Sequence, residues 1–382
     1  LKGNGNVAQT GIWAAGTGGG GLTLDAAYAG VVTLNFANTF SGPTLINAGT
    51  LRYGVSSALA AGSVGISGGV LDMGAFSDTV GAVTLTSGSI IGTGALTGSG
   101  FTLESGTVSA ILGGAGANLA KNTGGTVVLS GVNTFTGICT LNAGILRATT
   151  SAAALGAGTA ANALTLAGGT LQLANDTPLA YTRNTTVVGD VAIQSDRLTS
   201  GAGLTNTLSA LSMGTQTLTI GAGGLVTNGF AGISFTGAAL FTGNPTFNVV
   251  TNGSGAATIF TLGTLNDSGV PRMNTKSGPG TLVLGAAASS LVNGTMVSIA
   301  GGALNANIAA ALGTLAAVDV ADGAVLNLGA AQTFGALSNV GSTLNSGSVV
   351  IGGAFALTVN SAGVTTFSGA VGGTTALSSL TT

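Results

Sequence analysis

The sequence predicts an all-β protein, specifically a right-handed parallel β-helix (β-solenoid), and three observations support this prediction. Residues 31–52 align without gaps on residues 126–147, with about half of the aligned positions identical. Short runs in which apolar residues alternate with Thr, Ser or Asn recur between glycines, a pattern typical of half-buried strands. Glycine makes up 69 of the 382 residues, whereas charged residues make up only 5%. Since a short coil cannot bury its apolar side alone, such repeats are expected to fold by stacking on one another.

The repeat occurs in three copies, and each copy predicts the same succession of short strands. The copies cover residues 31–73, 126–173 and 281–328. The first two share the phrases Asn-Thr-Phe and Asn-Ala-Gly, whereas the third has Ala288-Ser289-Ser290 in place of Asn-Thr-Phe. Each copy continues through a tract rich in Ala, Leu and Gly into a second strand-like phrase, which reads GGVLDM, GGTLQL or DGAVLNL.

The strands are expected to be short and to join through glycine turns in coils of about 20 residues. The best helical pattern, over residues 308–318, has neither an acid-rich first turn nor a capping residue, so almost no helix is expected. The alternation within the strands predicts which side chains point into the core. These are Leu129, Leu146, Leu166, Leu171, Leu173, Leu282 and Leu284.

Composition shifts little along the chain, so residues 1–382 are expected to form one continuous solenoid segment. The sequence begins at Leu1 without a leader-like stretch and stops within a strand-like phrase. We therefore expect a section of a longer protein. The open strand edges of such a section would pair laterally or end to end with copies of the chain, or with further coils of the same polypeptide.

The unit at residues 124–148, GGTVVLSGVNTFTGICTLNAGILRA, resembles the passenger-associated β-strand repeat of bacterial autotransporters. Thr126, Leu129, Gly131, the Asn-Thr-Phe phrase and the Asn-Ala-Gly phrase stand in the places of that repeat. The first copy departs from it with Asn35-Phe36. The resemblance implies a β-helical fold and an extracellular location, on or outside the outer envelope of a bacterium. It implies a stalk and no active site.

Several classes of partner and cofactor are not expected. Eight Lys and Arg residues and a net charge of −2 cannot neutralise a row of phosphates, so no nucleic acid is expected to bind. No apolar run is long enough to span a membrane as a helix, so no membrane insertion by this segment is expected. Histidine is absent and Cys139 is the only cysteine, which excludes internal disulfides and Cys/His zinc sites. No cofactor and no metal are predicted.

A pair of acidic residues would be required for catalysis, because β-helices include enzymes that act on polysaccharides. Residues 175–197 hold five of the eighteen charges, and Asp190, Asp196 and Arg197 are the densest group. Asp196 and Arg197 are adjacent, so a strand would direct them to opposite faces. Asp319 and Asp322 flank an expected turn. We predict a solvated or locally paired group of charges and no catalytic residue.

Two further features have structural interpretations. Cys139 stands where the first copy has Thr44, which predicts a semi-buried filler and not a reactive thiol. Arg52 and Arg147 share one repeat position, where a stacking or solubility role is expected.

The prediction for function is a non-enzymatic extracellular scaffold, a section of a surface fibre or sheath. It would associate with itself or continue into further coils, and contact with a cell surface or matrix is a further possibility. Two alternatives stay open: the stalk of an autotransporter-type adhesin that carries a separate binding tip and, more remotely, a carbohydrate-active β-helix enzyme.

Overall fold

The computed structural model describes residues 1–14, 20–157, 163–251, 256–285, 287–314, 316–321 and 323–330, and beyond them five short strands as backbone. Every strand pair whose register the structure describes is parallel, and the only helix among the described residues is the 3-10 turn η1 (Ala152–Leu155). The best helical pattern in the sequence, at residues 308–318, forms turns and the start of a strand. The fold is therefore an all-β parallel solenoid, as the sequence predicted.

The chain divides into two compact units, which are described separately. Unit 1 comprises Leu1–Gln172 with Tyr181–Arg183, and unit 2 comprises Leu173–Ala180 with Asn184–Thr382. The prediction that one solenoid runs unbroken through residues 1–382 stays a prediction.

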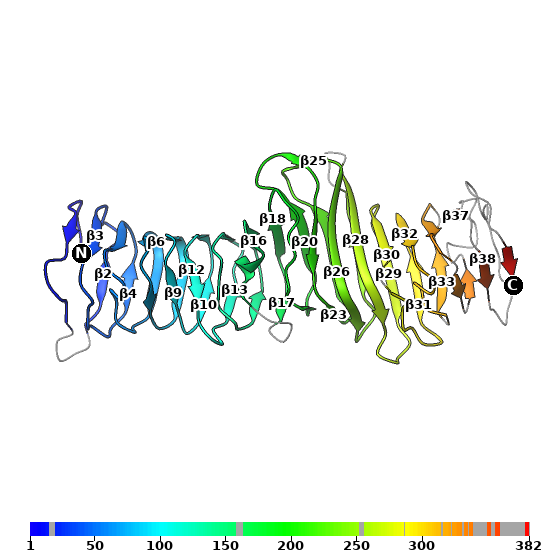
Figure 1. Ribbon diagram of the computed structural model, residues 1–382, viewed down its shortest axis with the longest axis horizontal. Coiled ribbons are helices and arrows are strands. Elements are labelled where there is room, and N and C mark those ends of the chain that lie inside the picture. Colours follow the sequence, from blue (N-terminus) through cyan, green and yellow to red (C-terminus); the bar gives the residue numbers. More distant parts are fainter. Residues whose placement is uncertain are drawn as a thin grey trace. The chain divides into compact units, whose positions relative to one another are not determined.

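Unit 1 is built from columns of stacked strands, each strand paired with its counterpart one coil later (Figure 1). Two long strands, β6 (Val64–Asp72) and β8 (Val83–Ile91), run through two columns and change register at a bulge between them. Besides β6 and β8, the first column holds β2 (Leu22–Leu24), β4 (Thr44–Ile46), β10 (Phe101–Leu103), β13 (Leu119–Lys121), β15 (Cys139–Leu141) and β17 (Leu164–Leu166). The second holds β1 (Val7–Ala8), β3 (Val31–Leu34), β5 (Thr50–Tyr53), β11 (Gly106–Val108), β14 (Thr126–Leu129) and β16 (Ile145–Thr149), and a third holds β7 (Asp78–Thr79), β9 (Ala95–Thr97) and β12 (Ile111–Gly113).

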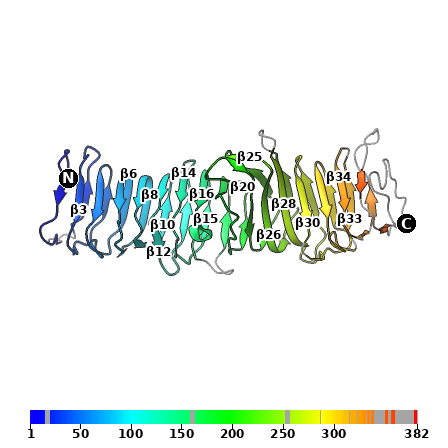
Figure 2. The same cartoon turned by 45° about the horizontal axis from the view of Figure 1, so that its top comes forward.

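Unit 2 repeats this arrangement with longer strands, of which β26 (Phe230–Phe241) and β28 (Ala257–Asn266) are the longest (Figure 2). One column holds β20 (Val191–Asp196), β24 (Thr217–Ala222), β27 (Thr246–Val249), β29 (Met273–Ser277), β31 (Met296–Ile299), β33 (Ala317–Val320) and β36 (Ala336–Ser338). Another holds β22 (Thr205–Leu208), β26, β28, β30 (Thr281–Leu284), β32 (Ala303–Ala306), β34 (Val325–Leu328) and β37 (Val350–Gly352). The remaining strands of unit 2 are β19 (Thr185–Val187), β21 (Gly201–Ala202), β23 (Leu211–Met213), β25 (Val226–Asn228), β35 (Gln332–Phe334), β38 (Ala356–Val359) and β39 (Ser379–Thr381). The residues of β18 (Thr170–Ala174) are divided between the two units.

The coils differ in length more than the expected 20 residues allows. In unit 1 the partners on successive coils lie 18 residues apart at Ser77 and Ala95, whereas in unit 2 they lie 29 apart at Thr219 and Asn248. The longer coils enclose a wider interior, which is filled by phenylalanines. Neighbouring rings among Phe235, Phe241, Phe247 and Phe260 have centroids 5.6–6.0 Å apart, within the range favoured by aromatic pairs.

The core of each unit follows the strict alternation of the strands. Strands such as β17 and β30 alternate buried and half-buried residues, because successive side chains point to opposite faces. All seven leucines predicted to point inward are buried, none more than 2% exposed: Leu129, Leu146, Leu166, Leu171, Leu173, Leu282 and Leu284.

The Asn-Thr-Phe phrase of the repeat forms a clamp between three successive coils. Leu112 N donates to Asn133 Oδ1 (2.8 Å), and Asn133 Nδ2 donates to Ala154 O (2.7 Å). Asn133 and Phe135 are both fully buried, whereas Thr134 between them is exposed. The phrase therefore combines a buried amide, which bonds to the coil before and the coil after, with an aromatic side chain in the core.

The first copy has the same clamp at Asn38. Trp13 N donates to Asn38 Oδ1 (2.8 Å), and Asn38 Nδ2 donates to Ala58 O (2.7 Å). The third copy, which lacks the Asn-Thr-Phe phrase, keeps both bonds with a hydroxyl instead.

In the third copy Leu265 N donates to Ser289 Oγ (3.0 Å), and Ser289 Oγ donates to Ala311 O (2.6 Å). A serine hydroxyl both accepts and donates, so Ser289, one residue after the place of the asparagine, can make both bonds of the amide.

The Asn-Ala-Gly phrase forms the turn between two strands of a coil. Gly49 and Gly144 have φ angles of +67° and +71°, a conformation that favours glycine. The asparagine before them faces outward and bonds along the stack: Ser67 Oγ donates to Asn47 Oδ1, and Asn142 Nδ2 donates to Asn122 Oδ1, both at 2.7 Å. The phrase therefore serves the turn and an outer ladder.

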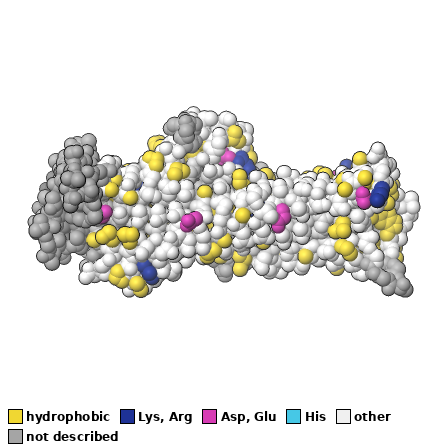
Figure 3. All heavy atoms as spheres, turned by 180° about the vertical axis from the view of Figure 1, so that it is seen from behind, with side chains coloured by type: hydrophobic (Ala, Val, Ile, Leu, Met, Phe, Trp, Pro, Cys, Tyr) yellow, Lys and Arg dark blue, Asp and Glu magenta, His cyan; other side chains and the backbone are white. Residues whose placement is uncertain are grey.

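The outer surface is mostly neither apolar nor charged, and Figure 3 shows few Lys, Arg, Asp or Glu side chains on the face in view. The recurring arginines take part in the outer ladders. Arg52 Nε lies 2.9 Å from Asp72 Oδ2, and Arg147 Nη1 donates to Gln172 Oε1 (3.0 Å). Each arginine thus bonds to a residue one coil later, which agrees with the expected stacking role.

Candidate functional site

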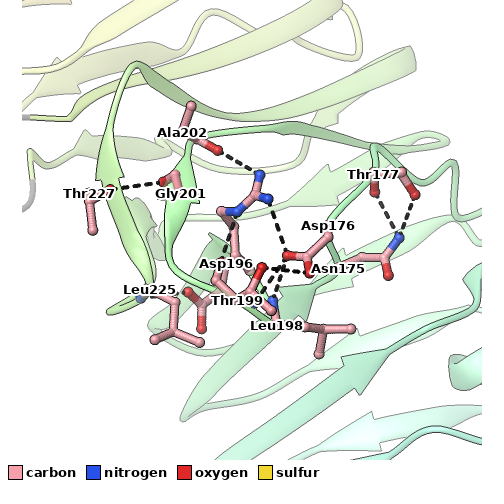
Figure 4. Close-up of polar contacts among 11 residues, drawn as sticks. Asn175, Asp176, Thr177, Asp196, Leu198, Thr199, Gly201, Ala202, Leu225 and Thr227 are labelled. Carbon is pink, nitrogen blue, oxygen red and sulfur yellow. Dashed lines mark hydrogen bonds and ion pairs between the residues drawn. The ribbon is translucent and has the colours of Figure 1, made fainter.

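Within the charged stretch at residues 175–197, Tyr181–Arg183 belong to unit 1 and the other residues belong to unit 2. The stretch ends where the chain leaves β20 for a loop that leads to β21 and β22. β20 alternates buried and half-buried residues up to Ile193 and ends on the buried pair Ser195 and Asp196. The chain then turns outward, and residues 198–200 are exposed. Figure 4 shows the side chains that gather at this turn.

Asp176, which lies on the preceding coil, accepts the hydrogen bonds that hold this loop in place. Its Oδ1 accepts hydrogen bonds from the backbone N–H groups of Leu198 and Thr199, both at 3.1 Å, and its Oδ2 accepts from Thr199 Oγ1 at 2.8 Å (Figure 4). Arg197 Nη2 lies 3.3 Å from Asp176 Oδ1. The hydrogen bonds from Thr199, with a smaller contribution from Arg197, hold the pKa of Asp176 below its usual value. The carboxylate is therefore ionised and saturated with donors.

Arg197 closes the loop from the other side. Its Nε donates to Thr199 O (3.0 Å) and its Nη1 donates to Ala202 O (2.8 Å). Together with the ion pair to Asp176, these bonds hold the guanidinium in place between two carbonyls and one carboxylate. Arg197 is thus locally paired, with Asp176 of the preceding coil.

Asp190 and Asp196 do not form a pair. They lie at opposite ends of β20, with Asp190 just before its first residue, so about 20 Å of strand separates them. Asp190 Oδ1 accepts from Thr217 N (2.7 Å), and Asp196 Oδ1 accepts from Leu225 N (3.1 Å). Paired carboxylates of glycosidases lie about 5–9.5 Å apart. These two aspartates cannot act together on one glycosidic bond.

The acidic pair near the end of the third copy is only partly described. Asp319 lies in β33 and is buried, with Ser298 Oγ donating to its Oδ2 at 3.4 Å. Asp322 lies outside the described residues.

Cys139 is more deeply buried than the sequence suggested. It begins β15 at the position where Thr44 begins β4, and its side chain is 0% exposed where a semi-buried side chain was expected. Burial raises the pKa of the Cys139 thiol to about 11. At neutral pH the thiol is protonated and enclosed, which makes it a packing residue.

Arg183 is a buried cation that the sequence analysis did not single out. Its guanidinium lies 5.3 Å from the centroid of the Phe135 ring, and its Nη2 donates to Gly137 O (3.1 Å). Burial lowers the pKa of Arg183. The run Tyr181-Thr182-Arg183 could have identified this buried cation. Its period-2 pattern directs Arg183 to the same inward face as Tyr181.

Two lysines, Lys121 and Lys276, are also buried, and backbone carbonyls surround their ammonium groups. Lys276 Nζ donates to Ser277 O (2.8 Å), Gly278 O (2.8 Å) and Gly301 O (2.9 Å). Burial lowers the pKa of Lys276 from its ordinary 10.5 to about 8. Each carbonyl belongs to the turn of its own coil or of the next one.

Lys121 is held in the same way. Its Nζ donates to Thr123 O and to Ala143 O, the latter at 3.1 Å, and burial lowers its pKa. Both lysines occupy inward positions of a strand, where the partners in register on the next coil are Leu141 and Ile299. They therefore bind two turns together from inside the core.

The described residues contain no group of three or more Asp, Glu, Cys or His side chains close enough to hold a metal ion. Among the described helices, none has the length and hydropathy that crossing a membrane requires. The charged side chains of Asp176, Arg197, Lys121 and Lys276 hold loops and turns in place.

Comparison with known proteins gives one similarity. No family model and no solved structure matches the chain. Over an alignment of 126 residues that covers 31% of the chain, it is 34% identical to the adhesin BmaC autotransporter of Brucella suis biovar 1 (strain 1330). The match covers 4% of that protein, so the chain corresponds to only a small part of its length.

Proposed function

We propose that this chain is a non-enzymatic structural segment of a bacterial surface or secreted protein, and specifically part of the stalk of an autotransporter-type adhesin. The observation that carries the proposal is the stacking of parallel coils in each unit with clamps between them. The similarity to an autotransporter adhesin supports it, as does the likeness of residues 124–148 to the passenger-associated repeat.

The hydrogen bonds between coils oppose tension that is applied along the stack. The hydrogen bonds of a parallel solenoid run from coil to coil, so tension along the stack is opposed by the whole set of backbone bonds. Asn133 and Ser289 add side-chain bonds in the same direction, from the preceding coil and to the following one. A stalk that holds a binding tip away from a cell needs this resistance.

Surface display is tested with an epitope placed in an exposed turn of unit 1. Ala115 and Gly116 are exposed, and a side chain at Gly116 would meet open space. A short tag inserted after Ala115 in the full reading frame of the source organism should be labelled on intact cells or in the culture medium. Detection only after lysis, alongside a cytoplasmic control protein, would contradict the proposal.

We also propose self-association as a second property of the scaffold. Eighteen charges on 382 residues leave little electrostatic repulsion between copies. Lateral contact of Gly, Ser and Thr surfaces would bury few unpaired charges, which are costly to desolvate. Sedimentation of the full chain over a wide concentration range should show association; a single monomeric species at all concentrations would refute it.

The remote enzymatic alternative has its own test. Turnover of pectin or alginate by the full chain, abolished by Asp190→Ala or Asp196→Ala, would overturn the non-enzymatic proposal. Because the two aspartates lie at opposite ends of β20 and each accepts a backbone hydrogen bond, we expect no turnover in any of the three proteins.

A further inference from the structure

The outer face of unit 1 carries two adjoining hollows over β4, β6, β8, β10 and β13. The first has a volume of about 340 Å³ and lies against Leu45, Asn47, Ser67 and Thr84. The second, of about 300 Å³, lies against Ser99, Thr102, Asn118 and Ala120. Ala82 lines both, so they meet at this residue. Each is at the lower end of the size of small-ligand sites.

The hollows exist because small residues occupy one column of the surface. The strands β6, β8, β10 and β13 pair in an order that aligns Val64, Val83, Phe101 and Leu119 in register. The residues immediately before these four therefore form an outward column, which reads Ser63, Ala82, Gly100 and Asn118. Ala82 and Gly100 leave the middle of this column open.

A second outward column supplies the polar groups. Gly65, Thr84, Thr102 and Ala120 are stacked in register on the same strands. Neither Thr84 nor Thr102 has a side-chain hydrogen bond to another described residue, so both hydroxyls are available to a ligand. They lie on neighbouring rungs, about 4.8 Å apart, which is close to the length of one pyranose unit in an extended glycan.

The amide groups at the two ends add directed donors. Asn118 Oδ1 accepts from Ile138 N (2.8 Å) and Asn47 Oδ1 accepts from Ser67 Oγ (2.7 Å). These bonds fix the orientation of both amides, and each Nδ2 group is left without a partner among the described residues. None of the side chains lining either hollow is charged.

We infer that these hollows together form a binding site for a neutral oligosaccharide. Such a ligand presents hydroxyls to Thr84, Thr102 and the amides of Asn47 and Asn118, and C–H faces to Ala82. An acidic glycan would need Lys or Arg at the site to offset the desolvation of its carboxylates, and the lining has neither. The inference goes beyond the proposed scaffold function and does not depend on surface display.

The test is a calorimetric titration of the full chain with neutral hexasaccharides of α-glucan and β-glucan type and with hexagalacturonate. The hollows are open and shallow, so we expect a Kd of about 1 mM for at least one neutral hexasaccharide and weaker binding of hexagalacturonate. Ala82→Trp fills the junction and should weaken binding at least tenfold. Ala115→Trp, at an exposed turn outside the hollows, is the matched control and should bind as the parent does.

The polar contribution is tested by the double variant Thr84→Val with Thr102→Val, which preserves side-chain shape and should weaken binding about tenfold. Circular dichroism checks that every variant is folded. No saturable binding of any neutral hexasaccharide, equal binding by Ala82→Trp, or tighter binding of hexagalacturonate would overturn the inference. If Ala82→Trp abolishes self-association in sedimentation while the parent binds no glycan, the hollows accommodate a second copy of the chain and the inference is wrong.

Discussion

Replacement of Asn133 by alanine removes the clamp of the second repeat without changing the surface. Asn133 is fully buried, and it joins the coil of Leu112 to the coil of Ala154 through two hydrogen bonds of 2.8 and 2.7 Å. Asn133→Ala therefore leaves one N–H group and one carbonyl without their side-chain partner inside unit 1.

The magnitude follows from those two groups. A typical intramolecular hydrogen bond contributes about 1 kcal/mol net, and an orphaned buried donor or acceptor costs about 1–3 kcal/mol. We expect Asn133→Ala to lower the free energy of unfolding by about 2–4 kcal/mol. Ser289 is only half-buried, so Ser289→Ala should cost less, about 1 kcal/mol.

Chemical denaturation followed by circular dichroism measures the change, and amide hydrogen exchange localises it. The N–H of Leu112 loses its acceptor in Asn133→Ala and should exchange faster than in the parent. The matched control is Asn142→Ala. Asn142 is an exposed asparagine of the same repeat copy, and its side chain bonds to Asn122 of the preceding coil. That control should cost no more than about 0.5 kcal/mol.

The reasoning fails if Asn133→Ala and Asn142→Ala have the same free energy of unfolding. It also fails if exchange at Leu112 is unchanged while exchange elsewhere rises, because the loss would then come from packing and not from the clamp. Either result would remove the structural explanation of the Asn-Thr-Phe phrase.

Three further outcomes are expected. Lys276 has a pKa of about 8 in the folded chain and 10.5 when unfolded, so the unfolded state binds more protons between these two pH values. The free energy of unfolding should therefore rise with pH across this range. Thermal unfolding of Lys276→Met should lack this rise, and that of the exposed-site control Lys2→Met should keep it. The Cys139 thiol should not react with a disulfide reagent at pH 8 in the native chain and should react fully in denaturant, because it is buried and its pKa is about 11; rapid native labelling would contradict this. Asp176→Ala removes the acceptor that holds the loop after β20, so trypsin should cleave after Arg197 faster than in the parent; an unchanged cleavage rate would show that the loop is held by other contacts.

The candidate site was only partly predictable. The sequence pointed to residues 175–197 as a group of charges, and Arg197 is indeed paired there. The partner, Asp176, lies one coil earlier, 21 positions along the chain, and its distance from Arg197 in space depends on the length of that coil. The same limit applies to Ser289, which takes over the clamp although the motif around it is lost.

The sequence by itself determined the features that depend on neighbouring residues. Alternation within strands set which leucines point inward, and the Asn-Ala-Gly phrase set the turns, because both reflect local backbone geometry. Only the tertiary structure decided coil length and every contact between coils. The bond from Lys276 to the Gly301 carbonyl, the contact of Arg183 with the Phe135 ring and the hollows at Ala82 each bring together residues from different coils. Their meeting depends on the register of stacked strands, which is fixed by the summed lengths of the turns between them.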